Sequence, residues 1–176
     1  VVSLECTPSS AAIAWADSLL GAHSDRRAIV VNHYLLDVGG AWGGPGQTIY
    51  DTLKDNPSLF LMLCGHRHGE AMRTDVYNGH TVYTLLADYQ DLSNGGNGWL
   101  RIMEFQPAND RIRVLTYSPY IDQYGTDATM GTGTTSQEFF LSYDMDEPSP
   151  GWVAYNDLDP RVPPDSSIDN APNVTE

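Results

Sequence analysis

The chain has 176 residues, of which 41% are hydrophobic, and this suffices for one domain with a buried core. Its formal net charge is −14, with Lys54 as its sole lysine against eight arginines, a balance that repels nucleic acids and anionic membrane surfaces. No apolar run approaches the length of a transmembrane helix, so we expect no membrane span.

The first part of the chain alternates between strand and helix patterns. Residues 1–5 predict a short strand, after which Thr7 is the expected N-cap of a helix and Pro8 its first residue. An apolar stripe of helical spacing continues to Gly21, where we expect the helix to end. The same part contains three further elements, namely a β-branched strand over 28–31, a helix over 48–55 and an apolar strand over 59–64. This order is typical of parallel β-α-β units in an α/β fold.

The pattern changes to hairpins after Glu70. Asn78-Gly79 is a strong two-residue turn signal between two alternating segments. Five strands are predicted in this part, over 73–77, 81–86, 99–106, 111–117 and 137–143. We therefore expect one domain over 1–147, followed by an acidic linker or tail over 148–176, rich in proline and aspartate. This lysine-poor tail contains a glycosylation sequon and favours a secreted or periplasmic protein.

Histidines follow two of the predicted buried strands. His33 comes just after the strand over 28–31, and His66 and His68 lie in a Gly-His-x-His-Gly segment after the strand over 59–64. Residues two apart in an extended segment point to the same side, and adjacent strands lie about 4.8 Å apart. We therefore expect three imidazoles at one sheet edge, a ligand type that suits Zn, Fe and Mn. The alternative is that these are ordinary structural or loop histidines. We expect the other two, His23 after a helix and His80 beside a hairpin turn, to be surface residues.

Two paired elements resemble the C-terminal half of a calcineurin-like metallophosphoesterase. They are Val30-Val31-Asn32-His33-Tyr34 at the end of one strand and Gly65-His66-Arg67-His68 at the end of the next. The downstream segments Asp88-Tyr89-Gln90 and Asn94-Gly95-Gly96-Asn97-Gly98-Trp99-Leu100-Arg101-Ile102, followed by Thr116-Tyr117-Ser118-Pro119, are similar to secreted bacterial members. The resemblance covers residues 1–147.

The resemblance implies a four-layer α/β/β/α sandwich that holds two metal ions, which in this family are Zn, Fe or Mn. His33 and His66 would bind the second metal, and His68 would bind the first. The implied reaction is hydrolysis of phosphate mono- or diesters by a hydroxide held between the two ions. Arg67, Asp88 and Gln90 are candidates for contact with the substrate, although we favour a solvated loop arginine and polar caps at a strand end as their explanation.

The motifs of the family's first half are absent from this sequence. There is no Asp-x-His, no Gly-Asp-x-x-Asp and no Gly-Asn-His-Asp/Glu, which supply the bridging carboxylate, an asparagine ligand and a catalytic histidine. We therefore expect the general acid in a missing N-terminal half, and we expect this chain to pair with that half or to self-associate. The alternative function is a non-catalytic β-rich binding or assembly module whose histidines are structural.

Several other residues have two interpretations. The glycine-rich segment 94–98 is either a mobile lip over a pocket or a turn that requires positive φ, and we favour the turn. Tyr34, Trp42 and Trp99 either form an apolar wall for a substrate or pack in the core, and we favour the core. Cys6 and Cys64 each end a predicted buried strand and are expected to be free thiols that pack in the core.

Overall fold

The structure of the protein is a computed structural model that describes residues 1–126 and 136–145. The first part of the chain forms a five-stranded sheet, in the order β1 (Val2–Ser3), β2 (Ala28–Val31), β3 (Leu59–Cys64), β5 (His80–Asp88) and β4 (Gly69–Tyr77). The first four of these strands are parallel, and β4 pairs antiparallel with β5. The parallel β-α-β units predicted from the sequence are therefore confirmed.

The second part of the chain forms a separate antiparallel sheet. β6 (Leu100–Gln106) and β7 (Arg111–Ser118) form its hairpin through the short helix η1 (Pro107–Asn109). On its other side β7 pairs with β8 (Gln123–Tyr124) and β9 (Glu138–Ser142). The predicted sequence of parallel units followed by antiparallel hairpins is thus present, and the expected tail over 148–176 lies outside the described residues.

The two longer helices begin elsewhere than predicted. Helix α1 (Ser10–Ala22) is capped by Ser9, whose hydroxyl accepts a hydrogen bond from the Ala12 N–H at 3.1 Å, so the prediction of Thr7 as the cap was wrong. It also continues through Gly21 and ends one residue later. Helix α2 (Gly46–Leu53) begins two residues earlier than expected, and its apolar side chains Ile49 and Leu53 are fully buried.

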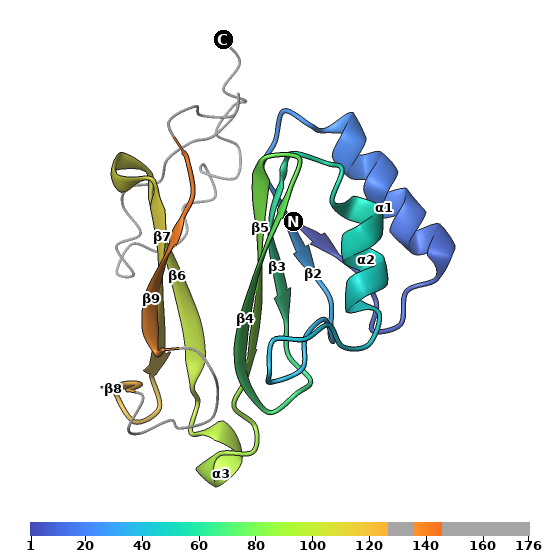
Figure 1. The fold of residues 1–176 in the computed structure, drawn as a ribbon. Coiled ribbons are helices and arrows are strands. Elements are labelled where there is room, and N and C mark those ends of the chain that lie inside the picture. Colours follow the sequence, from blue (N-terminus) through green and yellow to red (C-terminus); the bar gives the residue numbers. More distant parts are fainter. Residues whose placement is uncertain (127–135, 146–176) are drawn as a thin grey trace, which may run out of the picture.

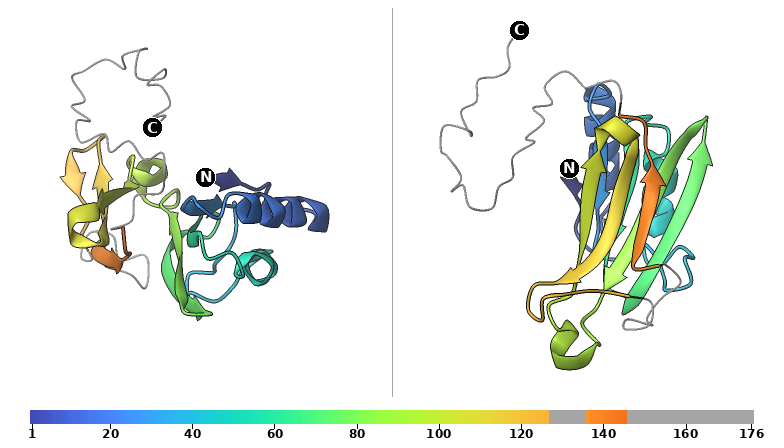
Figure 2. Two further views of the ribbon diagram at one scale, coloured as in Figure 1. Left: turned by 90° about the horizontal axis from the view of Figure 1, so that it is seen from above. Right: turned by 90° about the vertical axis from the view of Figure 1, so that its left-hand side faces the viewer.

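Helices and sheets form three layers. Figure 1 shows α1 and α2 against one face of the five-stranded sheet and the small sheet against the other face. The views of Figure 2 show the same stacking from two other directions. One buried apolar cluster lies between helices and sheet, and a second lies between the two sheets, with β3 contributing to both. A strand that is covered on both faces needs apolar side chains at nearly every position, which explains the continuous apolar sequence of β3.

The Asn78-Gly79 turn has positive φ at both residues, 49° and 86°, as a tight two-residue hairpin requires. Its strands are longer than predicted, and the register continues from Tyr77 opposite His80 to Gly69 opposite Asp88. This register places the segment after His68 beside the end of β5. The hairpin therefore links the Gly-His-x-His segment to the polar residues that follow β5.

Candidate functional site

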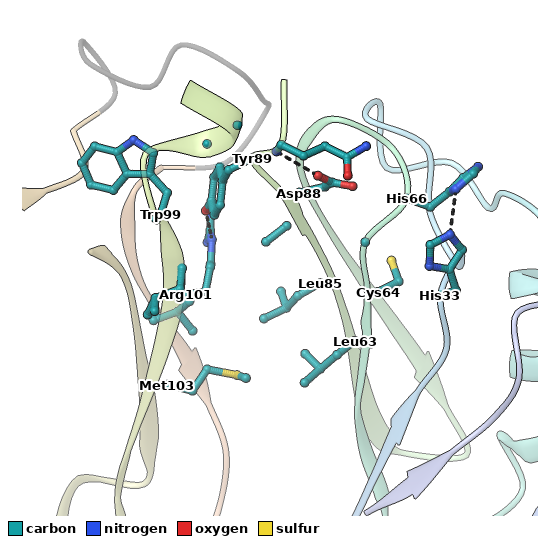
Figure 3. Close-up of a pocket in the computed structure, with 18 residues that line it drawn as sticks. His33, Leu63, Cys64, His66, Leu85, Asp88, Tyr89, Trp99, Arg101 and Met103 are labelled. Carbon is teal, nitrogen blue, oxygen red and sulfur yellow. Dashed lines mark hydrogen bonds between the residues drawn. The ribbon is translucent and has the colours of Figure 1, made fainter. Parts of the chain in front are cut away.

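His33 and His66 meet at the carboxyl edge of the parallel sheet. β2 and β3 are adjacent parallel strands, and beyond them the Gly65 N–H donates to the His33 carbonyl at 3.2 Å. The two rings pack edge to face with centroids 4.7 Å apart, and Nε2 of His33 lies 2.9 Å from Nδ1 of His66 (Figure 3). The structure therefore brings together two of the three predicted imidazoles.

His68 is held by other partners. Its Nδ1 donates to the Asp91 carboxylate, and the Gln90 side-chain amide donates to its Nε2. The expectation that His66 and His68 point to one side assumed an extended backbone, but β3 ends at Cys64 and His66 has φ of 70°. Across residues 1–126 and 136–145, no cluster of three or more His, Cys, Asp or Glu is arranged to hold a metal ion.

Asp91 is a contact that sequence reasoning missed. A carboxylate on one ring nitrogen fixes the tautomer and the orientation of an imidazole, and metal-binding histidines commonly have such a partner. The available signal was its place just after Asp88-Tyr89-Gln90, where the chain leaves β5. The Asp91 contact leaves Nε2 of His68 as the nitrogen with a lone pair, which in this structure accepts from Gln90.

A cavity of about 620 Å³ opens beside the two paired histidines, between the ends of β3 and β5 and the strand β6 (Figure 3). The polar part of its lining consists of His33, Cys64, His66, Asp88, Tyr89, Gln90 and Arg101. Its apolar part includes Leu63, Leu85, Trp99, Leu100, Met103 and Val114, from both sheets. The two histidines thus form part of one wall of the cavity, and residues of both sheets form the remainder.

Cys64 is half-buried in this wall and free, whereas Cys6 is exposed, so the expectation of Cys6 as a core thiol was wrong. Burial raises the pKa of the Cys64 thiol, partly offset by hydrogen bonds from the backbone of Leu35 and Leu36. The protonated thiol is the weaker metal ligand of the two forms. Cys64 is therefore a poorer candidate ligand than the two imidazoles beside it.

Of the three candidate substrate contacts, two line the cavity and the third, Arg67, is not among the residues that line it. Asp88 and Gln90 both line the cavity, with the Gln90 N–H donating to the Asp88 carboxylate at 3.1 Å. Arg67 points its Nε to Asp37 at 3.0 Å, and both side chains are roughly half exposed. A role of these three residues in substrate binding stays a prediction.

The aromatic residues have three different environments. Trp42 packs against the core and stacks on Tyr50 with centroids 5.1 Å apart, as expected of a core residue. Trp99 instead lines the cavity, so the preference for core packing was wrong there. Tyr34 contacts the ring of His66, with centroids 4.6 Å apart.

The segment 94–98 forms the short turn α3 (Ser93–Gly96) and the residues after it. All five positions from 94 to 98 have positive φ, so the preferred interpretation as a turn is confirmed. A side chain at Gly96 would lie 2.8 Å from the Tyr89 carbonyl oxygen, so the turn packs closely on the segment after β5. This packing brings its glycines into the cavity lining.

A buried polar cluster joins the two sheets next to the cavity. Glu70 is fully buried and accepts from Tyr89 Oη at 2.7 Å, Arg101 Nη2 at 2.9 Å and Gln137 Nε2 at 2.6 Å. Burial raises the pKa of Tyr89 to about 12, so its hydroxyl remains a donor at neutral pH. Glu70 also escaped sequence reasoning, because a glutamate after a loop gives no sign that it will be buried.

Comparison with known proteins adds one relative. No family model matches the chain. The chain is 38% identical, over 144 aligned positions that cover 76% of its length, to a protein named "Uncharacterized protein YvnB" from Bacillus subtilis (strain 168). The match covers 11% of that protein, so the chain spans about a tenth of the length of the curated relative it matches.

Proposed function

We propose that this chain is the metal-binding C-terminal half of a calcineurin-like metallophosphoesterase that hydrolyses phosphate mono- or diesters. The observation that carries the proposal is the separation of 2.9 Å between Nε2 of His33 and Nδ1 of His66. In this proposal both nitrogens bind one cation, and His68 serves a second cation through Nε2. Zn, Fe and Mn are the metals that imidazole ligands suit.

The separation of the two nitrogens is compatible with a shared cation. Metal–nitrogen bonds of about 2.1 Å and the angle near 90° of an octahedral ligand shell would place two ligand nitrogens about 3.0 Å apart. The rings come from neighbouring strand ends in a rigid parallel sheet, which keeps them close without a long loop. A hydrogen bond between the two rings would give the same distance, so the test must distinguish these two explanations.

The ligand set of this chain is incomplete for two cations. Two divalent ions a few ångströms apart need carboxylates to offset their repulsion, and the paired histidines supply no negative charge. When bound, the cations would supply Lewis acidity and an activated water for attack on phosphorus. The residues of this chain would hold the metals through His33, His66 and His68, and Asp91 would orient His68.

The unequal width of the two sheets supports a partner segment. The buried cluster between the sheets draws on β3 and β5, whereas β2 contributes only the half-buried Ile29 and β1 contributes nothing among the described residues. Across the same residues, β6 pairs with β7 alone, so its other edge is open. Further strands pairing with β6 would cover β1 and β2 and adjoin the cavity, where they would add the missing carboxylates.

None of the described helices is both long and apolar enough to cross a membrane. The remaining partner predictions are a phosphate-ester substrate and the missing N-terminal half, or a second copy of the chain. The length of the relative from Bacillus subtilis is compatible with a larger polypeptide that contains both halves.

The test uses the longer polypeptide that contains this chain, or this chain co-expressed with the missing half. We expect about two transition-metal ions per protein by elemental analysis and phosphatase activity on p-nitrophenyl phosphate. His66→Ala should lower the activity by at least tenfold and the metal content by about one ion per protein. His23→Ala, at an exposed position after α1, is the matched control and should change neither.

A protein without metal would favour the alternative function, a non-catalytic β-rich binding or assembly module. If the complete protein contains no metal and His66→Ala is silent, the contact between His33 and His66 is a structural hydrogen bond. For the isolated chain we expect weak binding of one metal at most, because its imidazoles leave the cationic charge uncompensated.

A further inference from the structure

The ring of Tyr34 lies against His66 with centroids 4.6 Å apart and an interplanar angle of 42°. His66 has φ of 70°, a conformation that costs a non-glycine residue of order 1 kcal/mol. In this conformation the imidazole projects from a bend rather than from a strand, so the ladder of β3 does not fix its direction. Neighbouring side chains must therefore hold the ring in place.

Tyr34 itself is held at three points. Its backbone N–H donates to the Asn32 side-chain oxygen at 2.9 Å, and Asn32 is buried. Its hydroxyl donates to Asp37 Oδ1 at 2.8 Å. Its ring lies directly on two glycines, because a Cβ at Gly43 would be 2.6 Å from Tyr34 Cζ and a Cβ at Gly44 would be 2.5 Å from Cδ1. Only residues without side chains allow the ring this position.

The loop that carries these glycines is closed by its own hydrogen bonds. The Gly43 N–H donates to the Leu35 carbonyl at 2.9 Å, and the Asp37 N–H donates to the Ala41 carbonyl at 2.9 Å. Asp37 also pairs with Nε of Arg67, the residue after His66, at 3.0 Å. One carboxylate thus links the hydroxyl of Tyr34 to the segment that contains His66.

We infer that Tyr34 is a positioning residue. Gly43 and Gly44 hold its ring against His66, and this contact orients the His66 imidazole toward His33 and toward a shared cation. The inference rests on the proposed function, because it assigns a purpose to the orientation of His66. Removing such a support commonly weakens metal binding by about 10- to 100-fold without removing a ligand. Tyr34 acts through His66 and is not itself a ligand.

The test compares Co(II) affinity, measured by titration of the visible absorption of Co(II), in the complete protein and its variants. Tyr34→Leu removes the ring, and we expect it to weaken Co(II) binding about tenfold or more. Tyr34→Phe keeps the ring and should bind Co(II) more tightly than Tyr34→Leu. Tyr120→Leu, at a tyrosine that is 74% exposed, is the matched control and should bind as the unmodified protein does.

Two further measurements separate positioning from general stability. The melting temperature of each metal-free variant reports unfolding, and NMR of the His66 ring reports its orientation without metal. We expect Tyr34→Leu to shift the His66 ring signals and broaden them. Gly43→Ala displaces the Tyr34 ring without removing it, so it should weaken Co(II) binding as well, even if Tyr34→Leu fails to fold.

The outcomes distinguish the two claims. If His66→Ala loses Co(II) while Tyr34→Leu and Gly43→Ala bind it normally, the inference is overturned and the proposed function stands. If His66→Ala binds Co(II) as tightly as the unmodified protein, both the metal site and the role of Tyr34 are overturned. If affinity falls only in proportion to unfolding, with unchanged His66 signals in the folded fraction, Tyr34 is merely structural.

Discussion

Glu70 illustrates how a single residue holds the two sheets together. Its carboxylate is fully buried, and three donors from β6, from the segment after β5 and from the segment before β9 converge on it. A buried charge is tolerated only when its partners are present, because neither ion can be solvated by water. Whatever the net contribution of the Glu70–Arg101 ion pair to folding, removing one of its two charges leaves the other buried and uncompensated.

We predict that Glu70→Gln destabilises the fold by about 3 kcal/mol or more, because Arg101 is left in the interior without its carboxylate. The matched control is Glu138→Gln, which breaks an ion pair of similar length with Arg113 at the surface, where Glu138 is 54% exposed. The control should cost less than about 1 kcal/mol. Urea unfolding followed by circular dichroism measures both values, and equal losses would contradict the assignment.

At the scale of elements, the loop before α2 depends on close backbone packing. A Cβ at Gly46 would lie 2.9 Å from the carbonyl carbon and the Cα of Leu35 and would overlap its carbonyl oxygen. Leu35 and Leu36 are both fully buried, so the loop cannot move outward without exposing them. The same loop carries the glycines that contact Tyr34, so its closure and the position of His66 are connected.

We predict that Gly46→Ala destabilises the fold by about 1–3 kcal/mol, because backbone atoms of the packed loop must shift to admit the methyl group. Gly39→Ala is the control in the same loop, since a Cβ there has no neighbour within 4 Å and its φ is ordinary. It should be neutral or slightly stabilising, by up to about 1 kcal/mol. Thermal unfolding of both variants measures the difference, and similar melting temperatures would refute the proposed packing.

At the scale of the whole molecule, the small sheet carries exposed apolar side chains. Leu100 and Ile102 of β6 and Phe140 of β9 are 42%, 38% and 49% exposed. An open strand edge beside exposed apolar residues favours association with another chain or segment. This surface adjoins the cavity, so association there would also affect the candidate site.

We predict that the isolated chain, of 19.4 kDa, scatters light as a species larger than a monomer at concentrations of tens of micromolar. Replacing Leu100 and Ile102 by lysine should shift it toward the monomer, because charge on an edge strand disfavours pairing. Trp15→Lys, at an exposed apolar position on α1, is the control and should have no effect. A compact monomer with a cooperative melting transition in the unmodified chain would contradict this prediction.

Elements with strong local patterns were predicted well. The bounds of β2 and β3 match the prediction, because a short apolar run between turn residues has few alternative structures. The cap of α1 was misplaced by two residues, since Thr7 and Ser9 are both suitable caps and only the helix geometry selects Ser9. β8 was missed because two residues form a strand only through their pairing with β7.

The candidate site was predictable in part for the same reason. His33 and His66 were placed together because parallel strands end at one edge, and this follows from chain order alone. The predicted position of His68 was wrong because the positive φ of His66 turns the chain, and no residue type in the segment indicated that turn. Its partners Asp91 and Gln90 come from beyond the hairpin, so only the long-range register brings them near.

The sequence by itself determined the α/β class, the parallel core strands and the meeting of two histidines, because these depend on hydrophobic period and strand order. Only the tertiary structure decided that Glu70 is buried, that His68 is bound by Asp91 and that Tyr34 supports His66. Each of these contacts joins segments whose approach depends on the packing of loops and sheets. Such packing is a property of the whole fold and leaves no mark on the local pattern of residues.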